Sequence, residues 1–390
     1  MEPLSIGTSP RRAKKSLTAT WVGILAVAAL LVLFLALFGF TTGATSPGSA
    51  EGVTLFVVGD WGREGTLNQT NVAELMSKVA LGMGKKPDAV ISTGDNMYGD
   101  LFAPLFPSIQ LGVSSALTTI IAATYSHMPC FRYPNGLNAT DDPLFDRSFV
   151  DVYSGKGLSG VPWYAVLGNH DYGDGFWTLC ENDRNTDDCD RGPQHQLGDS
   201  LHRRDTRWNL PDRNYVKSFG GGLLDVFFID TNPWIDEYRN TEWSPWNKNI
   251  LLAEDWRESL STLDQRLSES KALVKIVVGH HPTRSNGDHG PNLELVEHLE
   301  PILNEHRVQI YFSGHDHNLE HLKTGDMGFH QVVSGAGSDC TRGFHGTDSS
   351  VFQYPWSGFV AATVHGDGTV DVQFFTVEKG SKEFVYTFSI

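Results

Sequence analysis

The sequence has few cysteines and fewer basic than acidic residues. Its 390 residues include 4 Cys, 30 Lys and Arg, and 46 Asp and Glu, which gives a formal net charge of -16. Nucleic acids and anionic lipids attract clustered Lys and Arg, so this balance argues against either as the main partner of the folded part. An anionic ligand would need a locally positive site, and bound metal ions are a simple source of such charge.

Charged residues are absent from one long stretch, WVGILAVAALLVLFLALFGF at residues 21–40. At about 1.5 Å per residue, a helix of this length matches a bilayer core of about 30 Å. The basic cluster RRAKK precedes it, so residues 1–20 are expected to form a short cytoplasmic tail and 21–40 a signal anchor. The prediction is a single-pass type II membrane protein, with its folded part luminal or extracellular, at the cell surface or in an acidic organelle. A cleaved signal peptide is the alternative, although its apolar core usually covers only about 7–15 residues.

All four cysteines follow this apolar stretch, and their spacing matches no zinc-binding motif. In an oxidising lumen they could form two disulfides, for which three pairings exist. Because Cys180 and Cys189 are close together in a polar loop, that pairing is favoured, and Cys130 with Cys340 is the remainder.

Residues 41–52 are small and polar and are expected to form a linker. Residues 53–390 contain no repeat and no low-complexity tract, which favours one long folded domain. Two N-glycosylation triplets, at Asn68 and Asn138, agree with a luminal location for this domain.

Five short apolar runs in this domain each end in glycine followed by a residue that can bind a metal ion. Short, continuous apolar runs are typical of strands buried on both faces. The five junctions are Gly59-Asp60, Gly94-Asp95, Gly168-Asn169-His170, Gly279-His280 and Gly314-His315. Sites in open α/β sheets form beyond the carboxyl ends of strands, so these side chains are expected at one rim.

Helical patterns separate several of these runs, at residues 67–82, 250–270 and 292–306. The alternation predicts βαβ units and sheets covered by helices. Residues 359–390 instead show strand patterns with a turn at Asp367-Gly368, which predicts antiparallel strands and therefore a mixed sheet.

The candidate metal ligands combine carboxylate, phenol, amide and imidazole groups. They are Asp60, Asp95, Tyr98, Asn169, His280, His315 and His317. This mixture suits iron, manganese or zinc better than magnesium or calcium, which prefer oxygen ligands alone. Seven ligands exceed one tetrahedral site but suffice for two ions about 3.5–4 Å apart that share a carboxylate, an arrangement that stabilises in-line phosphoryl displacement.

The blocks GDWG, GDNMY, GNHD, VVGHH and GHDH, which begin at residues 59, 94, 168, 277 and 314, resemble the five motif blocks of the purple acid phosphatases. The small tartrate-resistant animal type of this calcineurin-like metallophosphoesterase group is the most similar. The resemblance extends over residues 53–390, the expected catalytic domain. It implies an α/β fold of the α+β sandwich kind, in which two mixed β-sheets pack together and helices flank them in four layers.

The resemblance also implies a division of the ligands between two ions. Asp60, Tyr98 and His317 would hold Fe(III), and Asp95 would bridge the two ions. Asn169, His280 and His315 would hold Fe(II), Zn(II) or Mn(II). A hard trivalent ion can deprotonate a phenol, and the resulting phenolate–iron charge transfer would colour the protein.

The activity implied is that of an acid phosphatase that hydrolyses phosphomonoesters, whether small molecules or phosphoproteins, by in-line attack of a metal-bound hydroxide. His170 and His289 match the residues that contact phosphate and deliver a proton to the leaving oxygen. As alternatives, His170 could only orient a ligand, and His289 could be a surface residue. His281 stands where this animal type has an aromatic residue, so it either contacts phosphate at the rim or has no role.

Other residues near the motifs carry open alternatives. Asp171 either orients a ligand or forms a turn. Any of the remaining histidines could support a ligand, and His321 is the one expected to do so. Residues 176–206 form either a disulfide-pinned loop beside the site or a solvated insertion.

Three other mechanisms or functions are less favoured. The sequence contains neither a GxSxG nor an RHG stretch, which disfavours covalent catalysis. A phosphodiesterase or pyrophosphatase on the same scaffold usually lacks the equivalent of Tyr98. A non-catalytic surface binding domain would be expected to have lost ligands, and every expected ligand is present.

Overall fold

The computed structural model describes residues 52–99, 135–173, 191–240, 248–340, 343–346, 350–378 and 383–390. The chain divides into two compact units, Met1–Ser49 and Ala50–Ile390, and the second contains all described residues. The expected signal anchor at 21–40 and nearly all of the linker lie outside the described residues. Within the described part, no helix is both long and apolar enough to cross a membrane.

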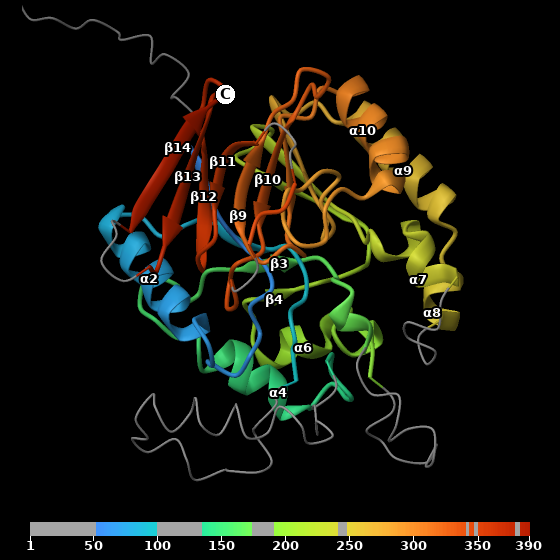
Figure 1. Ribbon diagram of the computed structural model, residues 1–390. Helices are drawn as coiled ribbons and strands as arrows, with labels where there is room; N and C mark the ends of the chain where they lie inside the picture. The colour runs from blue at the N-terminus through green and yellow to red at the C-terminus, as the bar shows by residue number, and fades with distance from the viewer. Residues whose placement is uncertain are drawn as a thin grey trace, which may run out of the picture. The chain divides into compact units, whose positions relative to one another are not determined.

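Two mixed sheets of seven strands each form the centre of the fold (Figure 1). In spatial order, the first consists of β14 (Phe384–Ser389), β13 (Val370–Thr376), β12 (Gly358–Val364), β1 (Val53–Val58), β2 (Ala89–Ser92), β3 (Trp163–Ala165) and β4 (Trp208–Asn209). The second consists of β11 (Ser350–Tyr354), β9 (Leu319–Leu322), β10 (His330–Ser334), β8 (Ile310–Ser313), β7 (Val274–Val278), β6 (Leu224–Phe228) and β5 (Tyr215–Phe219).

Helices lie on the outer faces of both sheets. The helices are α2 (Gln69–Gly82), α4 (Pro143–Phe145), α6 (Asp199–Arg204), α7 (Asp236–Asn240), α8 (Lys248–Leu252), α9 (Trp256–Glu269) and α10 (Leu293–Glu305). Short helical turns cover Asp146–Val150, His170–Tyr172, Pro193–His195 and Asn232–Trp234. One core packs α2 against the first sheet, and another packs α9 and α10 against the second. The layers therefore follow the expected order of helix, sheet, sheet and helix.

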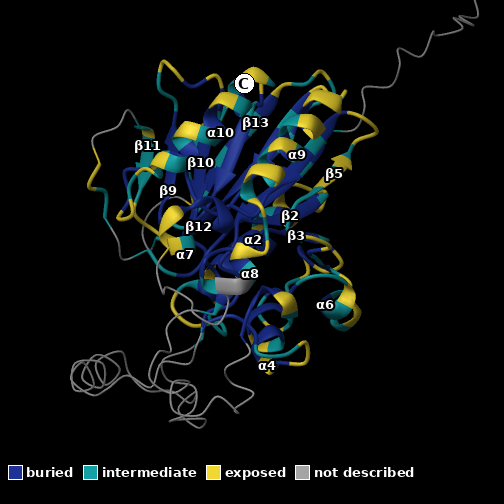
Figure 2. Ribbon diagram, turned by 90° about the vertical axis from the view of Figure 1, so that its right-hand side faces the viewer, coloured by how far each residue is buried: buried dark blue, intermediate teal, exposed yellow. Residues whose placement is uncertain are grey.

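The apolar runs of the sequence form strands that are buried on both faces. In β1, Leu55 and Val57 enter the core between the two sheets, whereas Phe56 and Val58 face the core beside α2. Successive side chains of a strand point to opposite faces, so a strand between two cores must be apolar at every position. Figure 2 shows the buried strands beneath α9 and α10, whose outer surfaces are exposed.

One predicted helix has different limits in the structure. Residues 250–270 were expected to be continuous, but α8 ends at Leu252 and α9 begins at Trp256. Asp255 lies between them with an extended backbone, and its carboxylate accepts a hydrogen bond from the Arg257 N–H at 3.0 Å. An aspartate in this position caps a new helix, which is why the chain restarts there.

The strand directions bring the five glycine junctions to one place. β1, β2 and β3 are parallel neighbours in the first sheet, and β7 and β8 are parallel neighbours in the second. Their carboxyl ends meet where the sheets adjoin, as the sequence predicted. β12, β13 and β14 are antiparallel, with Gly368 in the turn at a φ of 89°.

The described residues include only some of those expected to form disulfides or carry glycans. Cys130, Cys180 and Cys189 lie outside the described residues, and Cys340 carries a free thiol, so both pairings stay predictions. Asn68 Nδ2 donates a hydrogen bond to Ser357 Oγ at 3.1 Å. A glycan on Asn68 would have to replace this bond.

His321 does not support a metal ligand, contrary to the expectation. Its Nε2 lies 2.8 Å from His330 Nδ1, and its Nδ1 lies 3.1 Å from the Tyr386 hydroxyl. The His321 ring also stacks on Phe388 with centroids 3.8 Å apart. Since β9 and β10 belong to the second sheet and β14 to the first, this cluster joins the two sheets.

The same cluster predicts a loss of stability in acid. Burial lowers the pKa of His321 to about 3 and that of His330 to about 4, and the positive charge of Lys323 acts in the same direction. An unfolded histidine has a pKa of about 6.5, so the unfolded state binds more protons below that pH. The stabilisation is therefore complete above about pH 6.5 and is lost as the pH falls toward about 4.

We expect the free energy of unfolding, measured with urea, to fall between pH 7 and pH 4.5. His321→Phe keeps a ring against Phe388 but cannot take up a proton, so its decrease should be smaller. Equal decreases in the wild type and in His321→Phe would show that this cluster does not set the acid response.

Candidate metal centre

Three of the candidate ligands have unusual backbone conformations. Asp60, Asp95 and His315 each follow a strand and a glycine, with φ values of 60°, 50° and 69°. Residues other than glycine seldom adopt this left-handed region, and such strain typically occurs at functional sites. Two hydrogen bonds hold these turns together: the Asp60 N–H donates to Gly94 O at 3.0 Å, and the His315 N–H donates to Asp60 Oδ2 at 3.0 Å.

One group of ligands surrounds the hydroxyl of Tyr98. This oxygen lies 2.8 Å from Asp95 Oδ2, 3.1 Å from Asp60 Oδ1 and 3.3 Å from His317 Nε2. All four side chains are buried. One phenol hydrogen cannot serve two carboxylates at once, whereas a cation can bind all four groups together. This donor set fits a hard metal ion.

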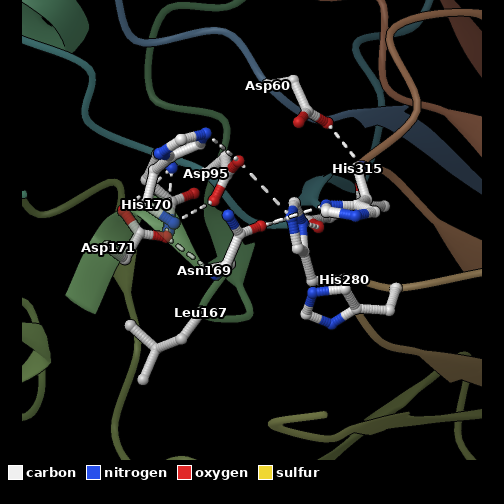
Figure 3. Close-up of polar contacts among 12 residues, drawn as sticks. Asp60, Asp95, Leu167, Asn169, His170, Asp171, His280 and His315 are labelled. Atoms are coloured by element: carbon white, nitrogen blue, oxygen red, sulfur yellow. Dashed lines mark hydrogen bonds and ion pairs between the residues drawn. The ribbon is translucent and has the colours of Figure 1, made fainter. Parts of the chain in front are cut away.

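A second group surrounds the side-chain oxygen of Asn169 (Figure 3). His280 Nε2 lies 2.9 Å from Asn169 Oδ1, and His315 Nδ1 lies 3.0 Å from it. His280 Nε2 is also 3.4 Å from Asp95 Oδ2, the oxygen that contacts Tyr98. Asp95 therefore touches both groups, as a bridging carboxylate must. The structure brings all seven candidate ligands together.

Neighbouring groups orient these ligands and balance their charge. His280 Nδ1 lies 2.8 Å from Thr93 O, which leaves Nε2 directed at the cluster. Burial alone would raise the pKa of Asp95, but His280 and His170 outweigh it and hold that pKa well below its usual value. Burial would likewise lower the pKa of His280, and Asp95 raises it to about 9. The site is thus arranged around negative oxygens that need a positive partner.

Asp171 orients the ligand loops and does not simply form a turn. Its carboxylate accepts hydrogen bonds from the Asn96 N–H at 3.0 Å, the Gly168 N–H at 2.8 Å and Gln196 Nε2 at 2.8 Å. These bonds tie the GDNMY loop to the GNHD loop. Gly168 is required there, because a Cβ at this position would lie 2.1 Å from Asp95 Oδ1.

His170 and His289 lie on the edges of the ligand cluster. The His170 N–H donates to Asp95 Oδ1 at 2.8 Å, and its ring packs on Tyr98 with centroids 4.9 Å apart. The His289 ring lies against His315 with centroids 4.1 Å apart. The His289 N–H donates to Asp316 Oδ1 at 2.9 Å, which fixes its loop beside the cluster.

His281 is buried behind the ligands and does not lie at the rim. Its Nδ1 is 2.8 Å from Thr231 Oγ1 and its Nε2 is 3.0 Å from the Tyr238 hydroxyl. Burial and the neighbouring His280 lower its pKa, so it is neutral. The His281 ring packs on His315 with centroids 4.5 Å apart, which gives it a supporting role. The alternative in which it contacts phosphate at the rim is wrong.

The sequence profile of the calcineurin-like phosphoesterases matches residues 53–319 of this chain. Purple acid phosphatase 3 of Arabidopsis thaliana is 33% identical over 342 residues, which cover 85% of this chain and 76% of the relative. The chain is a purple acid phosphatase. Tartrate-resistant acid phosphatase type 5 of Sus scrofa is 27% identical, over 82% of this chain and 79% of the relative.

Solved structures confirm the fold of this purple acid phosphatase. The purple acid phosphatase PPD1 from yellow lupin superposes with a TM-score of 0.54 at 16% identity, over 88% of this chain and 54% of that one. GAP50, described as the anchor in the inner membrane complex of Plasmodium, superposes with a TM-score of 0.57 at 22% identity, over 86% of this chain and 88% of that one. The family assignment makes this chain a metal-dependent phosphatase.

The motifs did not reveal every residue that shapes the purple acid phosphatase site. No motif includes Thr93, Gln196 or Arg63, although Thr93 and Arg63 adjoin motif blocks. Thr93 acts through its backbone carbonyl, which any residue supplies. Gln196 is far from the motifs in sequence, so only the folded chain places it there.

Proposed function

We propose that this phosphatase hydrolyses phosphomonoesters at a dinuclear Fe(III)–M(II) centre, where M is iron, zinc or manganese. The observation that carries the proposal is the position of the Tyr98 hydroxyl, 2.8 Å from Asp95 and 3.1 Å from Asp60. Burial and the two carboxylates raise the pKa of Tyr98 well above its usual value, and a neutral phenol has only one hydrogen for these two acceptors. As a phenolate bound to a trivalent ion, it would suit this position well.

The two groups of side chains would divide between the ions. Asp60, Tyr98 and His317 would hold Fe(III), and Asp95 would reach both ions. Asn169, His280 and His315 would hold the divalent ion. When bound, the ions would neutralise the phosphate dianion and make water acidic enough to serve as the nucleophile in an in-line displacement.

The remaining steps fall to side chains at the edges of the cluster. His170, whose N–H is fixed by Asp95 and whose ring packs on Tyr98, would deliver a proton to the departing alkoxide. His289, whose ring packs on His315, would contact the phosphate from the side of the other group of ligands. Both would favour the transition state by adding positive charge where negative charge develops.

The first test is the visible absorption spectrum of the purified full-length protein, recorded beside its metal content. We expect a visible band in the wild type and its loss in Tyr98→Phe with iron retained, because the band arises from the phenolate. Tyr153→Phe is a matched control. Tyr153 is fully buried in the core and its hydroxyl has no hydrogen-bond partner among the described residues, so its removal should leave the band in place.

A colourless wild type that contains two zinc or manganese ions would contradict the iron–phenolate assignment and leave a general dinuclear phosphoesterase. Faster hydrolysis of bis(phenyl) phosphate than of phenyl phosphate would favour the phosphodiesterase alternative. The likeness to the Plasmodium anchor concerns the fold alone, and the complete set of ligands favours catalysis. Membrane attachment through residues 21–40, with the catalytic domain in the lumen or outside, stays a prediction.

A further inference from the structure

Arg63, the residue after the GDWG block, lies flat on the face of Tyr98. Its guanidinium carbon is 3.6 Å from the centroid of the Tyr98 ring. Arg63 Nε donates a hydrogen bond to Ser338 Oγ at 3.0 Å, and Ser338 Oγ donates to Asp60 O at 2.5 Å. Arg63 is thus fixed to two candidate ligands, through the ring of one and the backbone of the other.

Among the described residues, the Arg63 guanidinium makes a hydrogen bond through Nε alone. Elsewhere in this acidic protein, arginines such as Arg147 and Arg204 pair with carboxylates, Glu64 and Asp146. No carboxylate approaches Arg63 among the described residues, and its two terminal nitrogens have no hydrogen-bond acceptor there. The residue is half-buried. A planar fork of donors of this kind matches the oxygens of a carboxylate or a phosphate.

Arg63 and His170 are neighbours of the same candidate ligand. His170 and Arg63 both contact the ring of Tyr98. Under the proposed function, His170 protonates the departing oxygen, so the leaving group must pass beside that ring. A second anionic group on the leaving group would therefore come within reach of Arg63.

We propose that Arg63 is a specificity-determining residue that binds a second anionic group, carboxylate or phosphate, on the leaving group of the substrate. The preferred substrates are then phosphomonoesters with another negative charge close to the scissile phosphate. This inference rests on the proposed function, because that function fixes the side on which the leaving group lies. A purely structural role for Arg63 makes a different prediction, since loosening Tyr98 would weaken all phosphate ligands alike.

The test is the binding of three non-hydrolysable probes to the full-length, metal-loaded protein, measured by calorimetry. Phenylphosphonate carries no second charge, whereas 3-carboxyphenylphosphonate and 1,3-phenylenediphosphonate each carry one. We expect Arg63→Gln to weaken at least one charged probe by about tenfold or more, the effect of losing one charge-assisted hydrogen bond. Its affinity for phenylphosphonate should change less than about twofold, and the probe that loses more identifies the preferred anion.

Two further variants sharpen the result. Arg204→Gln removes an arginine that packs on an aromatic ring, that of Phe145, and should leave all three affinities unchanged. Arg63→Lys keeps the charge without the planar fork, so it should recover part of the loss, and it replaces Arg63→Gln if that variant does not fold. Equal weakening of all three probes, or no weakening of any, would overturn the inference. Hydrolysis of phenyl phosphate is assayed separately, so absence of turnover with intact, Arg63-dependent binding would contradict the proposed function alone.

Discussion

Asp95→Asn is expected to lower kcat/KM for phenyl phosphate by at least about 10³-fold, the upper range for losing one electrostatic stabiliser. Asp95 is the only side chain that contacts both groups of candidate ligands among the described residues through a single oxygen, Oδ2. An amide at this position removes the negative charge between the two ions. It also turns one oxygen into a donor that would face Tyr98 or the His170 N–H.

The measurement pairs steady-state rates with metal content, so that loss of an ion is distinguished from loss of turnover. Asp142→Asn is the matched control. Asp142 is also buried and caps α4 by accepting from the Leu144 N–H at 2.9 Å, a role that asparagine can keep. Its carboxylate also lies 3.7 Å from Arg191, so this variant shows the effect of removing a buried charge that is not a candidate ligand. If Asp95→Asn kept more than a tenth of the wild-type kcat/KM, a bridging role for Asp95 would be excluded.

Trp61→Ala should reduce the free energy of unfolding by about 3–5 kcal/mol, as for other buried Trp-to-Ala changes. Trp61 is fully buried, and its ring contacts Tyr153 and Trp163 edge-on at centroid distances of 5.3 and 5.4 Å. Its Nε1 donates to Ser92 Oγ at 2.8 Å. The substitution therefore leaves a cavity in a closely packed aromatic core and removes one of the two hydrogen bonds of the Ser92 hydroxyl.

Trp61→Ala should also affect the candidate metal centre. Trp61 follows Asp60 directly, and Ser92 Oγ donates to Asn96 Oδ1 at 2.6 Å, beside Asp95. Urea unfolding measures the stability, and metal content after dialysis measures the site. Trp356→Ala removes an exposed tryptophan and should change stability by no more than about 0.5 kcal/mol. If Trp61→Ala lowered the free energy of unfolding by no more than this, the aromatic core would not be what holds the ligand loops in position.

Most of the candidate site could be predicted from the sequence because its ligands follow strands. Asp60, Asp95 and His280 each come directly after glycine at the end of an apolar run, and parallel strands collect such residues at one edge. The division between ions came from resemblance to a family, and the distances agree with it without testing which metals bind. The short apolar runs that form β1 and β7 were likewise enough to predict buried strands.

The roles of His281, His321 and Arg63 could not be predicted from the sequence in this way. His281 was expected either at the rim or without a role, but Thr231 and Tyr238, which are distant in sequence, bind both of its ring nitrogens. His321 lies four residues after His317, yet it belongs to a cluster with His330 and Phe388 that joins the two sheets. Nothing adjacent to Arg63 in sequence shows that it lies on Tyr98.

The sequence by itself determined the five strands that end in glycine, the C-terminal antiparallel strands, the approximate limits of α2 and α10, and the identity of the candidate ligands, because these depend on local periodicity, turn chemistry and donor type. The tertiary structure alone decided which side chains lie close together in the ligand cluster and which histidines lie outside it. It also decided that Arg63 lies over the ring of Tyr98. The physical reason is that these properties depend on contacts between segments far apart in the chain, such as the 3.0 Å bond between the His315 N–H and Asp60, and no local pattern encodes such a distance.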